Sequence, residues 1–102
     1  MCNLKEAQRQ EKLAMIFQGE GNKDKAIEHY IEAASIYVLN AELLKKDKLI
    51  ENANICYKQA QLLRGDKDIK DFSKQELARR TIMEGHRHQG DVLREIEQLL
   101  RV

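Results

Sequence analysis

The stretch from Lys23 to Lys46 is predicted to form one long helix with apolar side chains on two adjacent faces. On the first face, apolar residues follow one another at alternating intervals of three and four: Ile27, Tyr30, Ala34, Tyr37, Ala41 and Leu44. The second face carries Ala26, Ala33, Ile36 and Leu43. A helix that is apolar across two faces needs neighbours on both, because exposed apolar surface is unfavourable. The flanking segments are therefore expected to pack against this helix as a bundle.

The composition of the chain favours an all-α fold. Its 102 residues include no proline and five glycines, and the frequent residues Leu, Ile, Ala, Glu, Lys and Gln are good helix formers. Strands would require more Val, Thr and aromatic residues. A chain of this length forms one domain that buries roughly 60 to 65 percent of its unfolded surface, so it needs no metal or disulfide.

Charge and targeting signals favour a cytoplasmic protein. The formal net charge is +1 and acids and bases are mixed along the chain, so no strong field attracts nucleic acid or an anionic membrane. No apolar run reaches the length of a membrane span, and the segment after Met1 lacks the apolar core of a signal peptide. Cys2 and Cys56 are far apart, which suits reduced thiols. We expect a native start at Met1 and no membrane span.

Two shorter helices are predicted to flank the long one. The first begins at Asn3, which suits an N-cap, and ends in the glycine-rich turn of residues 18–22. The other begins after Asp47, the candidate cap, and runs antiparallel to the long helix because the connection is short. Its narrow apolar seam consists of Leu49, Ala53, Cys56, Ala60 and Leu63. Residues 1–65 are thus expected to form an antiparallel three-helix bundle.

Residues 66–102 are predicted to form a loop and an additional long, amphipathic C-terminal helix. Ser73 suits an N-cap, with Glu76 as its reciprocal partner in a capping box. Gly85 and Gly90 each cost about 1 kcal/mol relative to Ala, so the helix is either kinked or broken, and a kinked one is favoured. It would pack on the bundle or assemble a dimer as a coiled coil. The residues predicted for assembly are Ile82, Leu93, Ile96 and Leu100.

An Ala-x3-Tyr-x2-Ala pattern occurs twice, 27 residues apart. The two copies consist of Ala26, Tyr30 and Ala33 and of Ala53, Tyr57 and Ala60. Small residues around an aromatic let two helices approach closely, as in helical-hairpin repeats. The first copy resembles a tetratricopeptide repeat at Ala14, Phe17, Gly21, Ala26, Tyr30 and Ala33. Gln10 and Val38 stand where that repeat usually has Trp and Pro, and its period is longer, about 34 residues.

The stretches GEGNKDKAIEHYIEAASIYVLNA and ANICYKQAQLL, within residues 14–63, resemble an MIT domain, the microtubule-interacting and trafficking module. The resemblance lies in the glycine turn, the Ala-x3-Tyr start, the Tyr-x-Leu-x-Ala run and the end of the third helix. It implies a non-enzymatic module of trafficking, ESCRT or autophagy-type assemblies. Such a module binds amphipathic helices between helices 2 and 3 or 1 and 3. A tetratricopeptide or SNAP-like adaptor and a small regulatory dimer assembled through the C-terminal helix are alternatives.

Six residues are candidates for binding an amphipathic helical peptide: Leu39, Leu43, Ile55, Lys58, Gln59 and Leu62. Ile55 and Leu62 are seven residues apart and lie off the seam, so they are available once the core is filled, unless another element covers them. The two leucines of the long helix are the predicted opposite wall. Lys58 and Gln61 stand where many MIT domains have acidic residues, so an Arg-bearing ligand would find no carboxylate there.

No catalytic, cofactor-binding or metal-binding residue is predicted. His29 is not followed by the Lys-Gly that is usual after a phosphotransfer histidine. His86 and His88 are two residues apart, so on a helix they point in different directions and do not chelate one metal. The chain has no P-loop, H-E-x-x-H, paired-cysteine or G-x-S-x-G motif. We therefore expect a protein without enzymatic activity.

Overall fold

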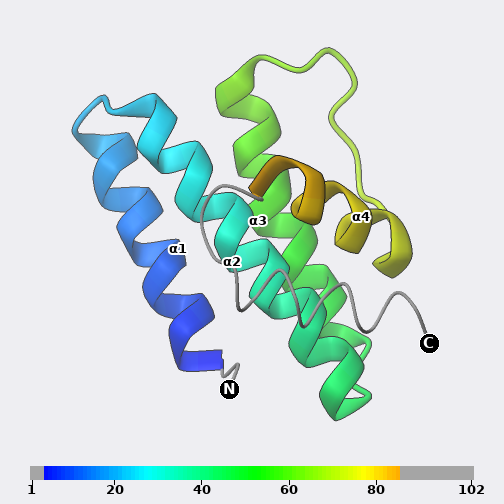
Figure 1. Ribbon diagram of the computed structural model, residues 1–102. Helices are drawn as coiled ribbons and strands as arrows, with labels where there is room; N and C mark the ends of the chain where they lie inside the picture. Colours follow the sequence, from blue (N-terminus) through cyan, green and yellow to red (C-terminus); the bar gives the residue numbers. More distant parts are fainter. Residues whose placement is uncertain (1–3, 86–102) are drawn as a thin grey trace.

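The computed structural model describes residues 4–85, which form four α-helices and no strand (Figure 1). The helices are α1 (Leu4–Gly19), α2 (Lys23–Leu44), α3 (Lys48–Arg64) and α4 (Lys74–Gly85). Consecutive helices α1, α2 and α3 run in opposite directions (Figure 1). The prediction of an all-α fold is confirmed.

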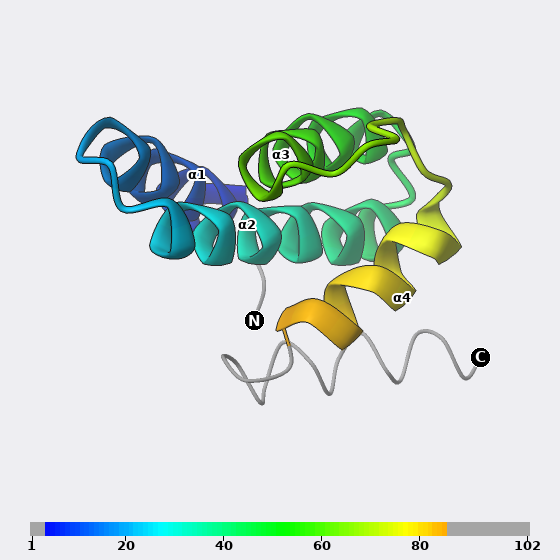
Figure 2. The same ribbon diagram turned by 90° about the horizontal axis from the view of Figure 1, so that it is seen from above.

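Helix α2 is the central element of the described chain. It makes extensive contacts with α1 and α3 and smaller ones with α4. Figure 2 shows α1 and α3 side by side on one side of α2, while α4 crosses the opposite side. Every residue from Ala33 to Ala41 is buried, including the polar Ser35 and Asn40, whose side chains donate to helix carbonyls. This burial agrees with the prediction that α2 needs neighbours on more than one face.

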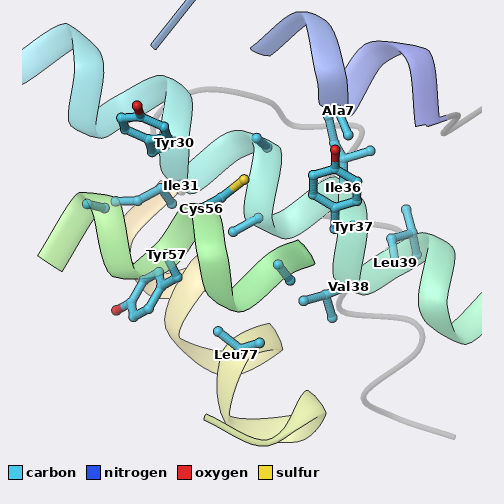
Figure 3. Packing of buried hydrophobic residues seen from close by; sticks show 14 of the residues in the cluster. Ala7, Tyr30, Ile31, Ile36, Tyr37, Val38, Leu39, Cys56, Tyr57 and Leu77 are labelled. Carbon is cyan, nitrogen blue, oxygen red and sulfur yellow. The ribbon is translucent and has the colours of Figure 1, made fainter. Parts of the chain in front are cut away.

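Alanines let α1 and α3 lie close to α2. Ala7 and Ala14 of α1 and Ala53 and Ala60 of α3 have no exposed surface. In Figure 3, Cys56 projects from α3 toward α2 and packs within the same cluster. The seam predicted for α3 therefore coincides with its buried face.

The first three helices all end in the same turn. In each, a residue one or two positions after the helix has a positive φ, and backbone N–H groups return to carbonyls of the last helical turn, as in a Schellman motif. Glycine occupies this position at Gly21 and Gly65, with φ of 81° and 79°. Lys45 occupies it after α2, with φ of 54°, so α2 ends at Leu44 rather than near Lys46 as predicted.

The N-terminal caps differ partly from the prediction. Asp47 lies at the N-cap position of α3, as predicted, but it has helical dihedral angles and its side chain makes no cap hydrogen bond. Ser73 does cap α4, since its Oγ accepts from the backbone N–H of Glu76 at 3.3 Å. The carboxylate of Glu76 pairs with Arg79 and Arg80 instead of reaching back to the cap. Half of the predicted capping box is therefore present.

The connection between α3 and α4 is fixed along α3. The Asn54 side chain accepts from the backbone N–H of Phe72 at 2.8 Å and donates to its carbonyl at 3.0 Å. The Phe72 ring lies edge-on to Tyr57, with centroids 5.7 Å apart, and Arg80 covers it at 4.1 Å. Ile69 of this connection is exposed. Whether the helix continues beyond Gly85 lies outside the described residues.

Candidate functional site

The outer face of α3 carries two exposed apolar side chains one heptad apart. Ile55 and Leu62 are each 55% exposed, and Lys58 and Gln59 lie half-buried between them. Residues three, four and seven apart share one face of a helix. The seam of small residues on α3 packs against α2. The opposite side of α3, which carries Ile55 and Leu62, is therefore left exposed. This half of the predicted binding surface is therefore accessible.

An open depression lies beside this face, between α3 and the segment that leads into α4. Its volume is about 480 Å³. Its lining residues are Asp47, Ile50, Glu51, Asn54, Ile55, Lys58, Asp71 and Lys74. Two of the predicted binding residues, Ile55 and Lys58, thus border one hollow in the surface.

The two lysines that line the depression each form an ion pair. Lys58 Nζ lies 2.8 Å from Asp71 Oδ1, and Lys74 Nζ lies 2.5 Å from Glu42 Oε2. The hydrogen bond from Lys74 lowers the pKa of Glu42. Both lysines are therefore held by carboxylates of neighbouring segments. Asp47 and Glu51 add further carboxylates to the rim, which sequence reasoning did not assign to a binding surface.

The leucines predicted to form the opposite wall are not placed together with this hollow. Leu39 is 1% exposed and belongs to the hydrophobic core, so it offers no surface to a partner in this structure. Leu43 is 53% exposed, but it lies near the C-terminal end of α2 and does not line the depression. The walls of the hollow come instead from α3 and from the residues before and at the start of α4.

One predicted assembly residue lies within the described range. Ile82 is half-buried and packs against the core cluster, so it contributes to the contact of α4 with the bundle. Leu93, Ile96 and Leu100 lie outside the described residues. Assembly through the C-terminal segment stays a prediction.

Two hydrogen bonds that the sequence did not reveal join α1 and α2. Tyr37 Oη donates to Glu11 Oε1 at 3.2 Å, and Tyr30 Oη donates to Gln18 Oε1 at 2.8 Å. Burial, together with the Glu11 carboxylate, raises the pKa of Tyr37 to about 12 and also raises the pKa of the Cys56 thiol. A thiol with a raised pKa stays protonated at neutral pH and is a poor nucleophile. These contacts are suited to fixing α1 against α2.

His29 is held in a similar structural arrangement between α1 and α2. Its Nδ1 lies 2.5 Å from Gln10 Oε1, and the Gln10 amide donates to Glu6 at 2.8 Å. The imidazole stacks on Phe17 with centroids 5.3 Å apart and planes 7° apart. Gln10, which stands where a tetratricopeptide repeat usually has Trp, thus links α1 to α2 through His29.

Residues 4–85 contain neither a metal-binding cluster nor a membrane-spanning helix. No group of three or more His, Cys, Asp or Glu side chains there is arranged to hold a metal ion. None of the four helices is both long and apolar enough to cross a membrane.

The comparisons with known proteins identify no relative. The chain matches no protein-family model, no curated protein and no solved structure. The MIT and tetratricopeptide resemblances are therefore supported by sequence motifs alone.

Proposed function

We propose that the chain is a non-enzymatic protein-interaction module that binds an amphipathic helical segment along the outer face of α3. The observation that carries this proposal is the exposure of Ile55 and Leu62 on one face, beside the depression that Ile55 borders. An amphipathic helix presents its own apolar residues at intervals of three, four and seven. Ile55 and Leu62 have the matching interval.

Energetics favour a partner on this face over solvent. Each of the two side chains leaves about half of its surface in water, and covering that half would contribute about 1 kcal/mol per residue. The flanking Lys58 and Gln59 provide polar groups that fix the orientation of the bound helix. A surface of this kind supports a modest affinity, which suits a regulated or multivalent assembly.

The kind of assembly follows from the resemblances. An MIT-like module would act in trafficking, ESCRT or autophagy-type assemblies, as an antiparallel three-helix bundle with α4 added. A tetratricopeptide or SNAP-like adaptor is the second candidate. The specific observation in its favour is that α1 and α3 lie side by side on one face of α2, with Tyr30 and Tyr57 of the two pattern copies buried.

The proposal is tested by selecting a displayed library of amphipathic helices on the full chain. The affinity of each selected helix is then measured for the unmodified chain and for the variant Ile55→Asp/Leu62→Asp, called the α3 variant. A matched control, Met15→Asp/Ile16→Asp, changes two equally exposed apolar residues of α1. We expect the α3 variant to keep its helicity and melting temperature while binding falls at least tenfold, and the α1 variant to bind normally.

Two results would refute the proposal. The first is the selection of helices that bind the α3 variant as tightly as the unmodified chain, which would place the binding surface elsewhere. The second is unfolding of the α3 variant while the α1 variant stays folded, which would show that Ile55 and Leu62 stabilise the fold. Single substitutions to Ser, which are milder than Asp, distinguish the second result from a nonspecific effect of buried charge.

A further inference from the structure

The end of the bundle formed by the α2–α3 turn combines exposed leucines with lysines. Figure 1 shows this turn at the lower end of the bundle, away from the α1–α2 turn. All residues from 43 to 48 are exposed, and we call them the basic tip. The tip contains Leu43 and Leu44, which are 53% and 48% exposed, followed by Lys45, Lys46 and Lys48.

The backbone of the tip shows that Lys45 is not the residue best suited to its turn. The equivalent positions after α1 and α3 are Gly21 and Gly65, whereas Lys45 adopts a positive φ of 54°. A side chain is unfavourable in this conformation, and glycine is not. The ion pair of Lys45 with Glu42 contributes little stability to the turn, because it spans 3.9 Å and the Lys45 side chain is 81% exposed.

The charge of the tip is net positive. Lys74 neutralises Glu42 from α4 through an ion pair of 2.5 Å, which leaves Asp47 as the acidic residue within the tip. Three lysines therefore face one carboxylate over six consecutive residues. The overall charge of +1 hides this excess, because acids elsewhere in the chain cancel it.

We propose that the basic tip binds the surface of a membrane that contains anionic lipids. The lysines contact the headgroups, and the adjacent Leu43 and Leu44 enter the interface between headgroups and acyl chains. Basic residues near an anionic surface and apolar residues in the interface strengthen such binding together. An acidic protein is the less suitable partner, because the leucines sit at an exposed end of the bundle and do not line the depression found beside α3.

The test uses the full chain and two kinds of vesicle, one of phosphatidylcholine alone and one of an equal mixture with phosphatidylserine. The chain contains no tryptophan, so Leu44→Trp introduces a single fluorescent reporter in the tip. We expect sedimentation with the mixed vesicles only, together with a blue shift of the Trp emission. Met15→Trp places the reporter at an exposed position of α1, away from the tip, and its emission should show no shift. Added salt should weaken the binding.

Charge variants separate a local effect from the net charge of the protein. Lys45→Gln/Lys46→Gln/Lys48→Gln removes the lysines of the tip, and about a fivefold loss per lysine predicts roughly a 100-fold loss of vesicle affinity. The control, in which Lys12, Lys23 and Lys67 are changed to Gln, removes the same charge from exposed positions elsewhere. It should retain at least a tenth of the affinity. Helicity must be unchanged in both.

Three results would overturn the proposal. The first is equal binding to the two vesicles, which would show that the lysines contribute nothing, or binding to neither, which is expected if the tip binds an acidic protein instead. The second is an equal loss of affinity in the two charge variants, which would indicate attraction by net charge alone. The third is vesicle binding without a blue shift at position 44, which would exclude entry of the leucines into the interface.

Discussion

Tyr37 donates a hydrogen bond across the α1–α2 interface to the carboxylate of Glu11, with 3.2 Å between Oη and Oε1. These residues are 26 positions apart in the chain. In the sequence, Glu11 follows Ala7 by four residues and precedes Ala14 by three, so it is a charged interruption of an apolar stripe on α1. The structure explains the interruption, because Tyr37 is only 4% exposed and its hydroxyl needs an acceptor.

Replacing Glu11 by Leu should therefore destabilise the fold although it extends an apolar stripe. The Tyr37 hydroxyl would lose its acceptor in a buried position, which costs about 1 to 3 kcal/mol. We expect a reduction of that size in the free energy of unfolding, measured by urea denaturation. In the double variant Glu11→Leu/Tyr37→Phe the orphaned hydroxyl is absent, so part of the loss should be recovered. Strictly additive single and double effects would show that the hydrogen bond contributes nothing.

Much of the helical fold was predictable because local patterns determine it. The spacing of small and apolar residues located α2 and the buried face of α3, and Ser73 marked the start of α4. Contacts between distant segments were not predictable in this way. Asn54, for example, holds the backbone of Phe72, and nothing in the local sequence of either residue announces the pairing.

In the candidate site, too, local patterns predicted some features, whereas features that depend on distant segments were not predicted. The exposure of Ile55 and Leu62 followed from their position opposite the α3 seam. Periodicity did not predict the burial of Leu39. Whether Leu39 is buried depends on which elements cover α2 and on where α4 crosses it. The basic tip was missed for another reason: net charge averages over the whole chain, whereas a surface responds to charges that lie together.

Lys45→Gly should stabilise the protein by about 1 kcal/mol, because glycine adopts a positive φ without steric cost. The reverse change, Gly65→Ala, should destabilise it by a similar amount. Space is not the reason, since nothing lies within 4 Å of a Cβ placed on Gly65; the positive φ alone is unfavourable. Urea denaturation of both variants measures the two effects. Destabilisation by Lys45→Gly would mean that the lysine side chain supports the turn.

The three tyrosines should ionise later in the folded chain than in the unfolded one. Burial raises the pKa of Tyr30 and Tyr57 above the ordinary value of 10.0, and raises that of Tyr37 to about 12. A raised folded-state pKa contributes stability that is fully present below pH 10 and is lost as the pH rises through about 12. Ultraviolet titration at pH 11 should show less tyrosinate in the native chain than in urea, with Tyr37 still mostly protonated in the native chain.

Tyr37→Phe provides the control for this pH dependence. The variant lacks the group whose folded-state pKa is about 12, so its stability should fall less steeply between pH 10 and pH 12 than that of the unmodified chain. Stability is measured by urea denaturation at each pH. Identical slopes in the two proteins would show that Tyr37 ionises normally in the folded state.

Glu84 is expected to hold the end of α4 against α3. Its carboxylate accepts hydrogen bonds from the buried Tyr57 hydroxyl and from the Arg64 guanidinium, and Arg64 also pairs with Asp66 at 2.8 Å. Glu84→Ala removes the acceptor from both donors, and a lost buried partner costs about 1 to 3 kcal/mol. Backbone amides of α4 should then exchange with deuterium about tenfold faster or more, measured by hydrogen-exchange mass spectrometry.

The distribution of the exchange distinguishes a local lock from a general loss of stability. Gln75→Ala changes an exposed residue of the same helix and should leave exchange unaltered. If Glu84 acts as proposed, α4 loses protection while the α1–α2 pair keeps it, because α1 packs against the opposite side of α2. Equal acceleration in α1 and α4 would mean instead that α4 unfolds only together with the whole bundle, and that no separate opening of α4 exists.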